Sequence, residues 1–167
     1  MTLKSTLSPE DWEQVMQAPF IAGFAVTAAD PGGLVGAFQE SSAMAKSLQN
    51  APGSDDEETV VGAIFAALKS SEGRSTIKEG LKTLIKGHSP ADASAAAVAR
   101  LTDLMSLVSQ KAPSEFDALA GLVRDTATNV AEAAKEGGFM GFGGTSVSDA
   151  EKKTLADIDA AISAARV

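Results

Sequence analysis

Carboxylates are the residue type in this sequence whose clustering could support chemistry. The densest cluster is the run Asp55-Asp56-Glu57-Glu58. At the N-terminus of a helix these carboxylates would complement the helix dipole, and we favour this interpretation. The alternative is a site for a hard cation, since calcium and magnesium prefer oxygen ligands. The ligand spacing of an EF-hand loop is absent, so the run alone does not define a metal site.

The single histidine, His88, restricts the available chemistry. It lies between Gly87, a helix stop, and Ser89, a helix cap, which indicates a solvated loop residue or a partner of the preceding helix C-terminus. A di-iron site of the four-helix type needs two Glu-x-x-His motifs, and no Gly-x-Ser-x-Gly elbow is present for a serine nucleophile. Cysteine is absent, which excludes thiolate zinc sites and cysteine nucleophiles. We therefore predict no catalytic residue and no cofactor.

The charge balance bears on the partners of the protein. The formal net charge is −8 and the isoelectric point is about 4.6. A nucleic-acid-binding protein must neutralise phosphates, so we expect no nucleic acid partner. Binding to an anionic membrane surface is disfavoured for the same reason. The longest apolar run, residues 18–29, is roughly half the length that spans a bilayer. Without cysteine or a signal-peptide pattern, we expect a cytoplasmic protein.

The elements that position these residues are predicted to be helices, because apolar residues recur at helical spacing and strand alternation is lacking. Helix starts are marked by Ser8-Pro9 with Asp11, by Ser54 with Glu57, by Ser89-Pro90 with Asp92 and by Ser148 with Glu151. One helix is expected from Leu34 to about Gln49, with Leu34, Phe38, Ala45 and Leu48 near one face. The segment SEGRS at residues 71–75 is expected to follow a helix and to precede a short one, which Ile77, Leu81, Leu84 and Ile85 mark and Gly87 ends. The sequence thus predicts one all-α domain over residues 1–167, a bundle of about seven helices.

One segment is apolar on every side. It begins at Pro19 and reads FIAGFAVTAA from Phe20. A helix that is apolar all round is buried all round. We therefore predict that this is the central helix, with Ala22, Gly23, Phe24 and Val26 almost completely buried.

A glycine-rich loop follows the helix that ends near Glu136. It reads GGFMGFGG and carries Phe139, Met140 and Phe142. Residues 133–141 (AAKEGGFMG) echo residues 28–36 (AADPGGLVG), which suggests an internal repeat of helix–Gly-Gly turn–helix units. We favour a loop that caps its helix and packs its apolar residues over the end of the bundle. The alternative is a mobile lid or a tip that docks a partner. A phosphate-binding use is rejected, since no strand precedes the loop.

The C-terminal segment GGTSVSDAEKKTLADIDAAI, together with AAD before the first turn, resembles the repeat phrase of tellurite-resistance TerB-like helical domains. In that family an Ala-Asp-Gly turn precedes a Ser-x-x-Glu cap and a Leu-x-x-Ile helix. The resemblance implies that Asp30 and Glu151 are acidic positions of a metal site. The chain departs from the phrase at Pro31, where the family has glycine, and at Gly143-Gly144, which replaces Asp-Gly.

Three classes of function stay open at this point. The first is a non-catalytic helical interaction or scaffold module, with a role in stress as one option, which binds a protein partner or forms a homo-oligomer. The second is the TerB-like alternative, an acidic cation-binding stress-response protein. The third is an enzyme with an unrecognised carboxylate site. We favour the first class, because no catalytic constellation is evident in the sequence.

The glycine-rich loop gives a first prediction. Changing Phe139 and Phe142 together to serine should sharply lower the free energy of unfolding, because these rings are expected to offset the ordering cost of the glycines by burying apolar surface. Thermal and denaturant unfolding measure the loss. An intact fold with lost self-association or partner binding would instead assign the loop to docking, and no change in either property would contradict both interpretations.

Overall fold

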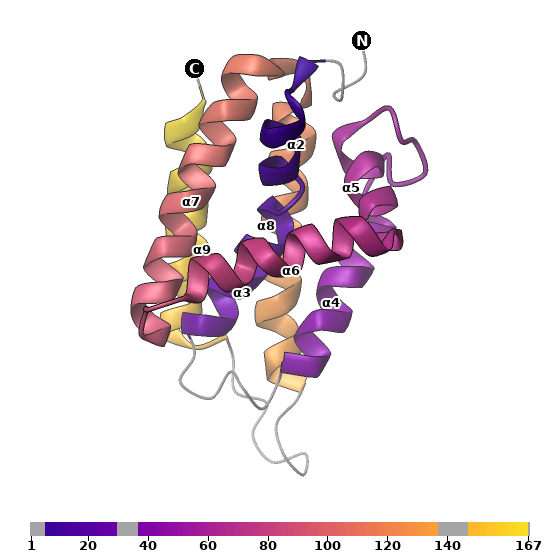
Figure 1. Cartoon of the computed structure of the whole chain (residues 1–167). Helices are drawn as coiled ribbons and strands as arrows, with labels where there is room; N and C mark the ends of the chain where they lie inside the picture. The colour runs from indigo at the N-terminus through magenta and orange to yellow at the C-terminus, as the bar shows by residue number, and fades with distance from the viewer. Residues whose placement is uncertain (1–5, 30–36, 137–146, 167) are drawn as a thin grey trace.

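The computed structural model of the chain describes residues 6–29, 37–136 and 147–166, which form a bundle of helices (Figure 1). No strand occurs within these ranges, and the all-α prediction is confirmed. In chain order the elements are α2 (Pro9–Val15), α3 (Ala18–Ala29), α4 (Ala37–Asn50), α5 (Val60–Lys69), α6 (Ser71–Ile85), α7 (Pro90–Lys111), the 3-10 turn η1 (Pro113–Glu115), α8 (Phe116–Glu136) and α9 (Asp149–Ala165). None of these helices is long and apolar enough to cross a membrane.

Helix α3 lies in the middle of the bundle, where it contacts α7, α8 and α9. Helix α4 packs along α8, and α9 packs along α7. The first turns of α7 and α9 lie close together, because Ala91 and Ala150 line one cavity with Ala29 at the end of α3. Helices α5 and α6 pack on each other at the edge of this group, and Figure 1 shows α6 crossing in front of the central helices.

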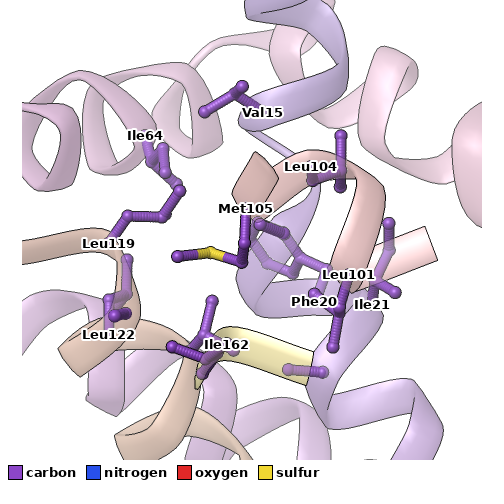
Figure 2. Packing of buried hydrophobic residues seen from close by; sticks show 14 of the residues in the cluster. Val15, Phe20, Ile21, Ile64, Leu101, Leu104, Met105, Leu119, Leu122 and Ile162 are labelled. Atoms are coloured by element: carbon purple, nitrogen blue, oxygen red, sulfur yellow. The ribbon is translucent and has the colours of Figure 1, made fainter. Parts of the chain in front are cut away.

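One hydrophobic core joins helices from both ends of the chain, from Leu7 before α2 to Ala165 of α9. In Figure 2, Met105 of α7 lies among labelled side chains that come from α3, α5, α8 and α9. Met105 is completely buried. Because segments that are distant in sequence meet in this one core, the bundle is expected to fold as one unit.

The prediction of a central helix is correct for α3, with one exception. Ala22, Gly23 and Val26 are buried, but Phe24 is only partly buried. Phe24 shares a face of α3 with Thr27 and Ala28, which follow at helical spacing and are also partly exposed. The opposite face packs on α7, α8 and α9. The helix is therefore covered on most of its circumference but not on all of it.

Two of the predicted capping boxes are present. Ser8 caps α2, with Pro9 in the first turn and the Asp11 side chain closing the box. Ser148 caps α9 in the same way with Glu151. In both boxes the serine hydroxyl accepts a hydrogen bond from the third helical N–H, while the acid accepts one from the serine N–H. The start of α7 is also as predicted, with Ser89 as its cap.

The predicted capping box of Ser54 and Glu57 is wrong. Helix α5 begins only at Val60, and Thr59 is its cap. The acidic residues 55–58 lie in exposed turns before the helix and not in its first turn. The carboxylate that reaches the start of α5 comes from η1, because the Val60 N–H donates to Glu115 Oε2 at 3.0 Å. Glu115, which is distant in sequence, thus complements the dipole of α5, where the sequence predicted that the neighbouring Glu57 would do so.

Two helices meet near the segment SEGRS, as expected, but the break lies at Ser70 and not in residues 71–75, and this part of the prediction is corrected. Ser70 ends α5 and caps α6, so residues 71–75 form the first turn of α6. The two helices meet at a sharp corner. A Cβ atom added to Gly73 would lie 2.2 Å from the carbonyl oxygen of Ala67, so only glycine allows this approach. The corner directs α6 across the bundle, as Figure 1 shows.

Helix α4 is described from Ala37 to Asn50, and the predicted start at Leu34 lies outside the described residues. Ala45, which was predicted to lie near one face with Leu48, is exposed. Leu48 is fully buried, as expected, and Ser47 beside it accepts a hydrogen bond from the Asn129 amide of α8 at 2.8 Å. A polar contact between α4 and α8 therefore lies beside the buried Leu48.

The corner between α5 and α6 generates a second prediction. Gly73→Ala should destabilise the fold by roughly 1–3 kcal/mol, since its methyl group would collide with a backbone carbonyl that cannot move aside freely. Gly121→Ala in α8 is the matched control. A Cβ at that position meets nothing within 4 Å among the described atoms, and replacing glycine inside a helix should stabilise by about 0.5–1 kcal/mol. Urea unfolding of both variants measures the difference, and equal effects would contradict the close approach.

Candidate functional site

Glu151, one of the two predicted metal-site positions, is engaged inside its own helix. Its side chain is buried, and its Oε2 atom accepts a hydrogen bond from the Ser148 N–H at 2.7 Å. The Ser148 hydroxyl in turn accepts from the Glu151 N–H at 3.2 Å. A carboxylate held in this way serves as the acid of a capping box. The structural role of Glu151 is therefore clear without a cation.

Asp30, the other predicted position, lies outside the described residues, as do Phe139, Met140 and Phe142 of the glycine-rich loop. The cation site, the docking loop and the similarity of the two Gly-Gly turns stay predictions. Their neighbours in sequence do come together. Ala29 and Ala150 line the same cavity of about 380 Å³ between α3, α7 and α9.

The other candidate residues from the sequence are exposed. His88 lies in the connection between α6 and α7, and the acidic run at residues 55–58 faces solvent. Within the described part of the chain, no three or more Asp, Glu or His side chains gather closely enough to hold a metal ion. The residues that the sequence singled out for chemistry are thus not brought together there.

A feature that the sequence analysis did not identify is a groove on the outer side of α5 and α6. It has a volume of about 400 Å³ and is lined by Leu68, Arg74, Ile77, Lys78, Leu81, Lys82 and Ile85. Six of these residues form two rows along α6, each with a spacing of four. The apolar row is Ile77, Leu81 and Ile85, and the basic row is Arg74, Lys78 and Lys82. We call these two rows together the α6 strip.

The apolar row becomes more exposed toward the end of the helix. Ile77 is buried, Leu81 is partly buried, and 40% of the surface of Ile85 is exposed. Ile85 is the large hydrophobic residue that stands out to solvent among the residues the structure describes. Gly80 and Leu84 lie beside the apolar row and face the bundle, because Gly80 approaches Gln17 and Leu84 packs against the core. The basic row therefore borders the apolar row on the side of solvent.

The three cations of the strip have different surroundings. The Arg74 guanidinium donates to the carbonyl oxygens of Leu68 at 3.1 Å and Lys69 at 2.7 Å, and so caps the end of α5. Lys82 lies 3.4 Å from Glu79 in an exposed pair, which is a weak interaction. Lys78 is exposed and forms no ion pair with the described side chains. Two lysine ammonium groups therefore face solvent next to an apolar row.

A second cleft lies on the other side of α6, between it, α5 and α2. It has a volume of about 400 Å³, and its walls include Trp12 of α2 and Met16 just after this helix, with Glu13 and Glu72 at its polar edge. Helix α2 is held in place by an ion pair of 2.6 Å between Asp11 and Lys111 of α7. The Lys111 ammonium, helped by the Ser8 hydroxyl, holds the pKa of Asp11 below its ordinary value. Trp12 packs against the core. This cleft therefore lies where α2 packs on the rest of the bundle.

Comparison of the chain with protein families, curated proteins and solved structures gave no significant match. The assignment of a site therefore depends on the geometry above. The sequence held a signal for the α6 strip, because Arg74, Lys78 and Lys82 run parallel to Ile77 and Leu81 at the same spacing. It was missed because Ile77, Leu81, Leu84 and Ile85 were used only as the signal of a short helix.

Glu151 gives a third prediction. Glu151→Gln should keep most of the wild-type stability, because glutamine can occupy the same position of a capping box. Glu151→Ala should cost on the order of 1 kcal/mol, since the Ser148 N–H loses its partner. Thermal melting with calcium, with magnesium and with EDTA completes the test. A cation-dependent rise in the wild-type melting temperature that Glu151→Gln abolishes would instead assign Glu151 to the TerB-like cation site.

Proposed function

We propose that this chain is a non-catalytic helical interaction module that binds a protein partner on the α6 strip. The observation that supports the proposal is the exposed end of the apolar row, Leu81 and Ile85, in a groove bordered by lysines. Apolar rows of this kind receive the apolar face of a partner helix in several known recognition modes. A cytoplasmic location and the absence of a nucleic acid partner are parts of the same proposal.

The position of α6 favours binding over a structural role for its outer face. Helix α6 packs more extensively on α5 than on any one of α2, α3 and α7. Its inner side already supplies Ile77 to the core. Fully burying an aliphatic side chain such as Ile85 is worth roughly 1.5–3 kcal/mol relative to exposure. Because Ile85 is partly exposed, part of this burial free energy is not realised in the fold. A docked partner that covered Ile85 would add it to the free energy of binding.

A fourth prediction tests this function. The probes are synthetic amphipathic helices with one leucine stripe and a polar face of glutamate, glutamine or lysine. At least one should bind the wild-type chain, and Leu81→Ser/Ile85→Ser should weaken that binding by about tenfold or more, as loss of a central apolar contact does. Fluorescence anisotropy of labelled peptides measures the affinities.

The control for this experiment is Thr83→Ala, an exposed position of α6 outside the strip. It should leave peptide affinity unchanged. Ile85→Ser alone is the milder variant, and it should change the free energy of unfolding by less than about 1 kcal/mol because the residue is exposed. Failure of all three peptides to bind, or binding that the serine substitutions leave intact, would overturn the proposed function.

A further inference from the structure

We infer that the partner of the α6 strip is an acidic amphipathic helix of another protein. This inference rests on the proposed function and specifies the chemistry of the docked element. The partner helix would lay apolar residues along Leu81 and Ile85. Its carboxylates, one turn apart, would face Lys78 and Lys82.

The local charge supports an acidic occupant. The chain as a whole carries a net charge of −8. Residues 69–86 depart from this balance, because they contain five cationic residues, Lys69, Arg74, Lys78, Lys82 and Lys86, against only the two acids Glu72 and Glu79. Concentrated positive charge beside an apolar row selects a partner with negative charge beside its own apolar row.

Lys78 and Lys82 would contact the partner helix, whereas Arg74 and Lys69 are engaged by groups within the fold. Arg74 caps the end of α5 through two carbonyl oxygens, and the Lys69 ammonium lies 4.0 Å from the centre of the Phe65 ring. Lys78 and Lys82 stand one helical turn apart on the solvent side of the apolar row. Glutamates at the same spacing on a partner helix would match both ammonium groups at once.

Two features of the chain disfavour a second copy as the occupant. Two α6 helices that paired antiparallel through their apolar rows would bring basic row against basic row, and like charges at this spacing repel. The densest acidic segment, residues 55–58, consists of carboxylates in exposed turns and offers no apolar side chain for the groove. The occupant is therefore assigned to a different protein.

An anionic membrane and nucleic acid also present negative charge, but the strip suits them less well. Both are extended surfaces that would meet the acidic remainder of the chain as well as the strip, and the net charge of −8 opposes such contact. A single helix covers only the groove. The acidic helix is thus the occupant that the charge distribution favours.

The experiment compares the three synthetic helices on two charge-reversal variants. Lys78→Glu/Lys82→Glu changes the strip, and Lys46→Glu/Lys152→Glu makes the same change in net charge at exposed positions of α4 and α9. The wild-type chain should bind the glutamate-faced helix at least about tenfold more tightly than the lysine-faced one, and added salt should reduce this preference. The strip variant should prefer the lysine-faced helix, and the control should behave like the wild type.

Each other outcome bears on a separate claim. If the three helices bind equally well and Leu81→Ser/Ile85→Ser weakens the binding of all of them, the inference of an acidic partner is overturned. The proposed docking function would then still stand. The inference would also be overturned by a dimer in sedimentation that Ile85→Ser dissociates, or by binding to phosphatidylserine vesicles or duplex DNA that exceeds binding to the acidic helix. If the reversal variant does not fold, Lys78→Gln/Lys82→Gln must abolish the preference for the glutamate-faced helix, and a retained preference would contradict the inference.

Discussion

The burial of α3 is the constraint on which the other helices depend. This helix contains no charged residue, and eight of its residues are buried. It must therefore be surrounded, and α7, α8 and α9 pack on it. The Ser94 hydroxyl of α7 donates to the Ala25 carbonyl of α3 at 2.8 Å, which satisfies a polar group that burial would otherwise penalise. With these positions taken, α5 and α6 pack at the margin of the core, and the outer face of α6 stays open.

Two local devices fix where that open face lies. The first is the contact between Glu115 and the Val60 N–H, which attaches the start of α5 to the connection between α7 and α8. The second is the approach of Gly73 to the Ala67 carbonyl, which turns the chain sharply into α6. Neither device is part of the strip, yet together they set its position across the bundle. A change at either place would move the whole row of lysines relative to the core.

The sequence predicted most of the helices because the periodicity of apolar residues and the Ser-Pro and Ser-x-x-acid starts are local signals. It failed where a distant group competed with a local one. Ser54 and Glu57 have the spacing of a capping box, but Thr59 caps α5 and a remote carboxylate reaches its first turn. Phe24 was assigned to full burial from its apolar neighbours in sequence, although burial depends on which helices cover each face. The strip was missed for the converse reason, since an apolar row at helical spacing does not reveal whether anything covers it.

The roles of the charged residues explain why an acidic protein can still receive an acidic partner. Asp11 and Glu151 complete capping boxes and Glu115 reaches the start of α5, so these carboxylates already have partners within the fold. Lys78 has no such role among the described residues. At physiological ionic strength charges are screened over about 8 Å, so a docked helix responds mainly to its nearest groups and only weakly to the net charge of the chain. The ammonium groups of Lys78 and Lys82, beside Leu81 and Ile85, are those nearest groups. The local electrostatic potential at the docking site is therefore positive.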